Sequence, residues 1–128
     1  CLATFHAGRL IATNWYSTGS TEIAADCIVR FPAAYVVSHD TFVDPAFRGQ
    51  GVAFESWRVS REIFLARGAT HILSCVRSGN VSSIRAMDKD EHTAWVGHVV
   101  AWRGLGRRAV FTSPGCRRLG IRAAMIRA

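Results

Sequence analysis

A strand candidate, a glycine-bearing turn and a helix candidate follow one another between residues 34 and 67. The segment Ala34–Val43 is rich in Tyr, Val, Thr and Phe, which favour strands. Asp44 and Pro45 end it, because proline cannot donate to a β-ladder. A second buried strand candidate follows at His71–Val76. A strand, a helix and a strand in this order predict a parallel unit, and therefore an α/β fold.

The helix candidate runs from about Gly51 to Arg67, and Gly68 supplies the left-handed residue that commonly ends a helix. Its apolar residues fall on two adjacent rows, which together predict one broad buried face. The rows are Val52, Val59, Ile63 and Ala66, and Ala53, Trp57 and Phe64.

The first 33 residues contain two short strand candidates, Leu2–His6 and Arg9–Tyr16, joined by a tight turn. The polar run Ser17–Ser20 predicts a loop. The next stretch, Thr21–Val29, has apolar residues at helical spacing but is too short to assign.

A short helix is expected at Val81–Lys89, and a strand pair at Thr93–Trp102 and Ala109–Ser113. The stretch Arg117–Ala128 mixes apolar residues with arginines, which predicts a frayed amphipathic helix or a disordered end. We therefore expect one domain over residues 1–113, followed by a basic tail over residues 114–128.

The net charge of +7 lies entirely in residues 103–128, which contain seven arginines and no acidic residue. Such a block can attract phosphates or anionic surfaces, but a solvated basic tail is the favoured interpretation. Nucleic-acid binding is less favoured, because the arginines are not clearly interleaved with aromatic residues.

Other partners and locations are constrained by what the sequence lacks. No apolar run approaches the ~20 residues of a membrane-spanning helix, so no membrane contact is expected. The four cysteines form no Cys-x-x-Cys pair and the histidines lack partners at useful spacing, so we assign no metal. A cytoplasmic protein is expected, because no signal peptide is visible and the cysteines predict no disulfide framework. A homodimer is left open.

The turn Arg48-Gly49-Gln50-Gly51-Val52-Ala53 has the properties of a diphosphate site. The first N–H groups of a helix have no intrahelical partner, and the helix dipole adds positive charge there. Small residues let a phosphate approach this backbone closely, and Arg48 adds a cation. A glycine turn that only connects two elements is the alternative. A nucleoside-triphosphate loop is excluded because no Lys follows Gly51, and a dinucleotide fingerprint because position 54 is Phe.

The run from Phe42 to Ala53 resembles the acyl-CoA signature of the GNAT acyltransferase superfamily, Arg/Gln-x-x-Gly-x-Gly/Ala after a strand ending in Val-x-Pro. The downstream order agrees over roughly Ala34–Ser113: a helix, a buried strand, Asn80 opening a short helix, and a final strand pair. The resemblance implies a GNAT-like fold with a central mixed β-sheet flanked by helices.

The resemblance also implies a set of cofactor contacts for acetyl-CoA or another acyl-CoA. Backbone groups of Phe42 and Val43 would meet the pantetheine and the thioester oxygen. The pyrophosphate would be held by Arg48, Gly49, Gln50, Gly51, Val52 and Ala53. Asn80, with Ser83 three residues on, would meet the cofactor near its reactive end, although Asn80 is equally well interpreted as a helix cap.

In this family an amine attacks the thioester directly, and the strand before the loop often supplies the general base. Here that strand carries His39 and Asp40, which should point to opposite faces because strand side chains alternate. We favour Asp40, because alternation places it on the face of Phe42. Each residue could equally be structural, Asp40 as a hydrogen-bonded carboxylate and His39 as a partly buried histidine.

Two departures from the family pattern affect the expected function. Met87 stands near the position of the family's Tyr general acid and has no proton to donate. Only about 33 residues precede Ala34, fewer than the family's usual strand and two helices. The expected function is N-acyl transfer, most simply acetyl transfer, to a small-molecule or protein amine. A non-catalytic acyl-CoA-binding or regulatory domain is the alternative, followed by a basic nucleic-acid-binding module.

Overall fold

The computed structural model describes residues 1–24, 26–104 and 107–126, and divides the chain into two compact units. Unit 1 consists of Cys1–Gly19 and Ala33–Ser74, and unit 2 of Ser20–Pro32 and Cys75–Ala128. The family signature therefore lies in unit 1, whereas the block of arginines lies in unit 2.

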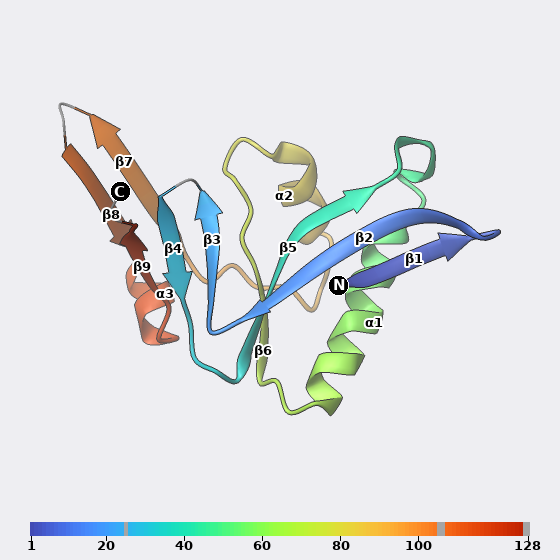
Figure 1. Ribbon diagram of the computed structural model, residues 1–128, viewed down its shortest axis with the longest axis horizontal. Helices are drawn as coiled ribbons and strands as arrows, with labels where there is room; N and C mark the ends of the chain where they lie inside the picture. Colours follow the sequence, from blue (N-terminus) through green and yellow to red (C-terminus); the bar gives the residue numbers. More distant parts are fainter. Residues whose placement is uncertain (25, 105–106, 127–128) are drawn as a thin grey trace. The chain divides into compact units, whose positions relative to one another are not determined.

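Unit 1 is a four-stranded sheet with one long helix (Figure 1). Its elements are β1 (Leu2–His6), β2 (Arg9–Thr18), β5 (Tyr35–Val43), η1 (Pro45–Phe47, a 3-10 helix), α1 (Val52–Ala66) and β6 (His71–Ser74). The strand order is β1-β2-β5-β6, and only the β5–β6 pair is parallel. The expected mixed sheet and its parallel strand–helix–strand unit are thus confirmed.

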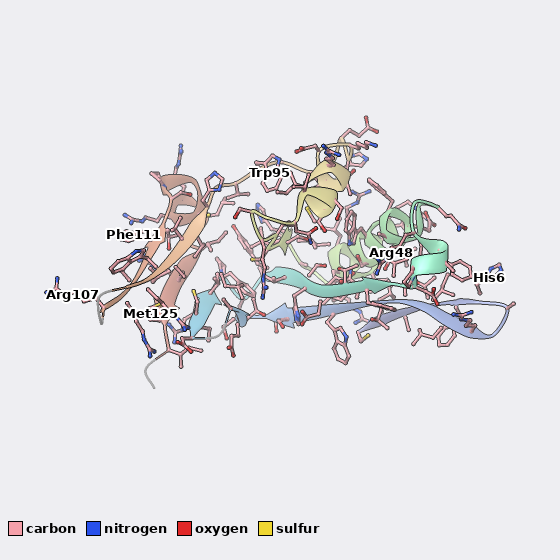
Figure 2. All side chains as sticks on the ribbon, turned by 90° about the horizontal axis from the view of Figure 1, so that it is seen from above. His6, Arg48, Trp95, Arg107, Phe111 and Met125 are labelled. Carbon is pink, nitrogen blue, oxygen red and sulfur yellow. The ribbon has the colours of Figure 1, made fainter. Side chains whose placement is uncertain are left out.

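Helix α1 lies on one face of this sheet (Figure 2), and it touches the sheet through its middle. Its most deeply buried residues are Ser56 and Ser60, whose small side chains bring the helix close to the strands. The ring of Phe64 lies 4.7 Å from that of Tyr16 on β2. The predicted apolar rows are therefore not the most deeply buried part of the helix, because the two serines lie at the centre of the contact.

The described residues of unit 2 form two small antiparallel sheets and two short helices. Its elements are β3 (Ser20–Ala24), β4 (Cys27–Arg30), α2 (Val81–Met87), β7 (Val99–Gly104), β8 (Arg107–Thr112), α3 (Pro114–Arg118) and β9 (Arg122–Met125). One sheet has the order β3-β4-β9 and the other is the β7–β8 hairpin, from which Arg107 and Phe111 project (Figure 2). Arg103 and Arg108 of the hairpin both contact the carboxylate of Asp26, which lies between β3 and β4.

The expected loop at residues 17–20 is wrong, because β2 extends to Thr18 and β3 begins at Ser20. The ambiguous stretch Thr21–Val29 falls within the β3–β4 hairpin. This stretch forms strands despite the helical spacing of its apolar residues, because β4 pairs with β9 as well as with β3.

The expected frayed helix or disordered end at Arg117–Ala128 is also wrong for the described residues. Pro114 begins the short helix α3, and β9 then pairs with β4. Gly115 lets α3 lie close to the backbone of Val96, because a Cβ there would lie 2.0 Å from the carbonyl oxygen of Val96. The strand expected from Thr93 begins only at Val99. Among the described helices, none is long and apolar enough to cross a bilayer.

Candidate functional site

The β5-to-α1 turn adopts the conformation that its glycines allow. Asp44 caps η1 by accepting a hydrogen bond from the backbone N–H of Ala46, at 2.9 Å, and its other oxygen pairs with Arg9 at 2.6 Å. Gly49 and Gly51 then have φ angles of 74° and 80°, which residues with a Cβ rarely adopt. The backbone conformation therefore requires glycine at both positions, and a ligand that approaches this backbone closely requires it too.

The N-terminus of α1 is open to a ligand. Gly51 is the N-cap residue, and among the described residues no side chain caps the helix. A Cβ placed on Gly49 or Gly51 would meet no described atom within 4 Å. Gln50, Gly51 and Val52 line an open cavity of about 650 Å³, with β1 on its other side. The N–H groups of this helix end have no intrahelical partner, and the glycines beside them leave space that an anion can enter.

Two side chains are anchored along the same turn. The Nε of Arg48 donates to the carbonyl oxygen of Val43 at 3.1 Å, and the Nε2 of Gln50 donates to that of Ala46 at 2.9 Å. The guanidinium has five N–H donors, so one bond to the backbone leaves others for a phosphate. Arg48 lies beside the beginning of α1 (Figure 2). The turn therefore presents backbone amides and a positioned cation together.

Strand β5 contains a β-bulge at Asp40. Its φ is 49°, and between the pairs Thr13–Phe42 and Trp15–His39 one residue of β2 faces two residues of β5. The one extra residue shifts the alternation of side chains. Ser38 and Thr41 are three apart, yet both hydroxyls donate to Asn14 Oδ1, at 3.0 and 2.8 Å.

The bulge overturns the expected placement of the two candidate bases. Phe42 now shares a face with His39 rather than with Asp40, because the inserted residue reverses the alternation beyond it. His39 and Asp40 do not point apart: Nδ1 of His39 lies 2.8 Å from Oδ2 of Asp40. The preference for Asp40 on the grounds of a shared face is therefore wrong.

A third side chain, unforeseen in the sequence, completes this cluster. The Oγ of Ser17 lies 2.8 Å from Nε2 of His39. Asp40 is exposed (81% for the side chain), whereas the His39 side chain is 26% exposed. Nothing in the sequence near Ser17 indicates this contact, because it depends on the pairing of β2 with β5.

A buried polar network lies on the α1 side of the same strands. Asn14 is fully buried, and its Nδ2 donates to the hydroxyl of Tyr16 at 2.6 Å. Burial raises the pKa of the Tyr16 hydroxyl, and hydrogen bonds from Ser60, Asn14 and Ser38 oppose this effect in part. This network fixes the bulge from the helix side.

Asn80 and Ser83 lie in unit 2, and the helix-cap interpretation of Asn80 is confirmed. Its Oδ1 accepts from the backbone N–H of Ser83 at 3.2 Å and from the hydroxyl of Ser82 at 3.0 Å. Helix α2 ends at Met87. The expected contact of Asn80 and Ser83 with the cofactor stays a prediction. Phe42 is 53% exposed, and Val43 lies opposite Ala12 in the ladder.

Comparisons with known proteins agree with this geometry. The model of the acetyltransferase (GNAT) family matches residues 5–91. A search of the curated proteins gives no match. Two similar solved structures are of AAC(6')-Iy, one with the bisubstrate analogue CoA-S-monomethyl-acetylneamine and one described as an aminoglycoside N-acetyltransferase in complex with CoA.

Both structures have a TM-score of 0.63 and 18% sequence identity over 80% of this chain, a likeness that shows the fold. The chain covers 66% and 72% of their lengths. The family model extends over more than half of the chain and includes the bulged strand, the glycine turn and α1. The chain therefore belongs to the acetyltransferase (GNAT) family.

Proposed function

We propose that this chain transfers an acyl group, most simply acetyl, from acyl-CoA to an amine. The observation that carries this proposal is the uncapped N-terminus of α1, which begins at a glycine with open space before it. It lies within the region matched by the family model.

The cofactor's diphosphate would be held by the described turn. Backbone N–H groups of Gly49, Gly51, Val52 and Ala53 supply uncharged donors, and Arg48 supplies the cation. Gln50 is tied to the backbone and shapes the turn. Phe42 and Val43, at the end of β5, would offer backbone groups to the pantetheine. When bound, acyl-CoA supplies a thioester, which is an activated acyl group.

His39 is the general base that we propose for the acceptor amine, and Asp40 is its positioning residue. An ionised carboxylate only accepts hydrogen bonds, so Nδ1 of His39 carries the hydrogen that is shared with Asp40. In the neutral imidazole, Nε2 is then the acceptor and can take a proton. This arrangement favours His39 over Asp40 as the group that removes the proton.

A non-catalytic acyl-CoA-binding domain is the second candidate, and Met87 favours it. A thioether cannot donate a proton to the leaving thiolate. In the first candidate that proton comes from water, from Ser83 or from another group. The two candidates share the diphosphate site and differ only in turnover.

The acceptor is proposed to be an amine on a small molecule or a protein. Aminoglycosides belong in the test panel because AAC(6')-Iy is an aminoglycoside N-acetyltransferase. Of the four carboxylates in unit 1, Asp44, Glu55 and Glu62 contact arginines and Asp40 contacts His39. Unit 1 thus offers few acidic groups to a polycation, so monoamines belong in the panel as well.

The test begins with acetyl-CoA and thermal unfolding. A ligand that binds only the native state raises the melting temperature. At 100 times its Kd it adds about 2.7 kcal/mol to the free energy of unfolding. Desulfo-CoA should give a similar shift, and adenosine without phosphates should give none. An unchanged melting temperature would remove both candidates. Thiol release with the amine panel then separates an enzyme from a binding domain.

A further inference from the structure

A hydrogen-bonded chain joins Ser17, His39 and Asp40, and the proposed acyl transfer to an amine uses only His39 and Asp40. Oδ2 of Asp40 lies 2.8 Å from Nδ1 of His39, and Nε2 lies 2.8 Å from Oγ of Ser17. A hydroxyl within reach of a base, which is itself oriented by a third group, is the arrangement of an activated nucleophile. All three residues lie in unit 1.

The β-sheet explains why these residues meet. Ser17 lies opposite Val37, and His39 lies opposite Trp15, so Ser17 and His39 are diagonal neighbours on one face of the β2–β5 pair. A regular strand would place Asp40 on the other face. The bulge, with its φ of 49°, instead brings the carboxylate of Asp40 to His39.

The hydrogen positions follow from the chemistry of the partners. Asp40 can only accept, so Nδ1 of His39 donates to it, and in the neutral ring Nε2 accepts from the hydroxyl of Ser17. The hydroxyl hydrogen thus points at the base. Ser17 is half-buried.

The face beside Ser17 also fits an apolar group. Trp15 is directly opposite His39 in the ladder and is 51% exposed. Phe42 lies on the same face and is similarly exposed. An aromatic or acyl chain can therefore pack against these rings while its carbonyl lies at Ser17.

We infer that Ser17 is a nucleophile that hydrolyses activated acyl esters through an acyl-serine intermediate. Oγ of Ser17 forms a bond to the acyl carbon, and the bond from that carbon to the leaving oxygen breaks. The hydroxyl proton passes to Nε2 of His39 and then to the leaving oxygen. Water then attacks the acyl carbon, and the bond from that carbon to Oγ of Ser17 breaks. A proton from the water passes through Nε2 of His39 to Oγ, and the carboxylic acid leaves.

The full chain with p-nitrophenyl acetate tests this activity without any CoA. We expect a burst of p-nitrophenol in stopped-flow measurements and, after rapid quenching, an acetyl group on the peptide that contains Ser17. Ser17→Ala should remove both the burst and that modification. His39→Ala should slow hydrolysis by roughly 100-fold, as for loss of a general base. Asp40→Asn should slow it less, because water screens an exposed carboxylate.

Further variants separate this activity from nonspecific reaction and from misfolding. Ser74→Ala removes an exposed serine from β6 of the same sheet and should behave as the unaltered chain. Ser17→Cys should restore a burst, because a thiol can replace the hydroxyl. Trp15→Ala should raise KM more than it lowers kcat.

Three results would overturn the assignment of Ser17. These are a rate equal to that of buffer, an unchanged burst in Ser17→Ala, or acetylation confined to His39 or to the exposed thiols of Cys1 and Cys75. Since the substrate contains no CoA, any of these results leaves the acyl-CoA proposal untouched. Failure of acetyl-CoA to bind would likewise leave this inference standing.

Discussion

Helices α1 and α2 begin in different ways. At α2 the side chain of Asn80 accepts a hydrogen bond from the backbone N–H of Ser83, so part of the helix end is satisfied by the protein. At α1 the N-cap is Gly51, and no side chain among the described residues takes that role. The longer helix thus has the less satisfied N-terminus, although a cap there would stabilise it.

This difference fits the diphosphate site proposed at the first turn of α1, because the protein itself does not cap that turn. Glycine in place of a capping side chain costs only roughly a few tenths of a kcal/mol, so Gly51 gives up a small contribution to stability. A bound diphosphate can restore this stability, because its oxygens accept hydrogen bonds from the same N–H groups. At α2 the side chain of Asn80 already accepts such a hydrogen bond, so no ligand is required there.

The largest effect is expected from capping α1 artificially with Gly51→Asp. Asp tolerates the left-handed conformation better than most residues, and its carboxylate would occupy the N–H groups and repel phosphate. We expect at least roughly 100-fold weaker CoA binding by calorimetry, about 2.8 kcal/mol, with the fold retained. Gly8→Asp, at a φ of 77° in the β1–β2 turn, is the control. Equal affinities in the two variants would remove the site.

A smaller effect is expected from Arg48→Gln, which removes the cation and leaves the backbone of the turn. We expect roughly 10-fold weaker CoA binding and a shallower dependence of Kd on salt, because one charge-assisted contact is lost. Arg61→Gln makes the same change of charge on α1 and should bind as the unaltered chain does. If both variants lose affinity equally, general attraction by the net charge explains the binding.

The capped helix provides the converse test through Asn80→Ala. Loss of the cap should lower the free energy of unfolding by about 1 kcal/mol, measured in urea, whereas Asn80→Asp should keep most of it. The expected contact of Asn80 with the cofactor predicts in addition that Asn80→Ala weakens CoA binding. If CoA affinity is unchanged in both variants, Asn80 is a cap alone.

The smallest effect is expected at Tyr16, which contacts α1 through the ring of Phe64 rather than near the N-terminus of the helix. Burial raises the pKa of Tyr16 above its ordinary value of 10.0, so the folded state favours the neutral hydroxyl. This contribution to the free energy of unfolding is complete below pH 10.0, and it is lost as the pH rises through the raised pKa of Tyr16. Urea midpoints above pH 10 should therefore fall more steeply for the unaltered chain than for Tyr16→Phe, and parallel curves would contradict this.

The sequence by itself determined the local features of the site. Pro45, Gly49 and Gly51 predict a strand, a turn and a helix from backbone preferences alone, and the structure has all three in that order. The family, the mixed sheet and the capping role of Asn80 could also be predicted, since each depends on residues close together in the chain or on a continuous signature.

Only the tertiary structure decided which side chains meet. The bulge at Asp40 exists because β5 has one residue more than β2 over the same span, and no local pattern in β5 reveals that register. The contact of Ser17 with His39 and the pairing of β9 with β4 join segments distant in sequence. Register and long-range pairing are set by the packing of the whole sheet, so local patterns misplaced the face of Asp40 and the structure of the C-terminal segment.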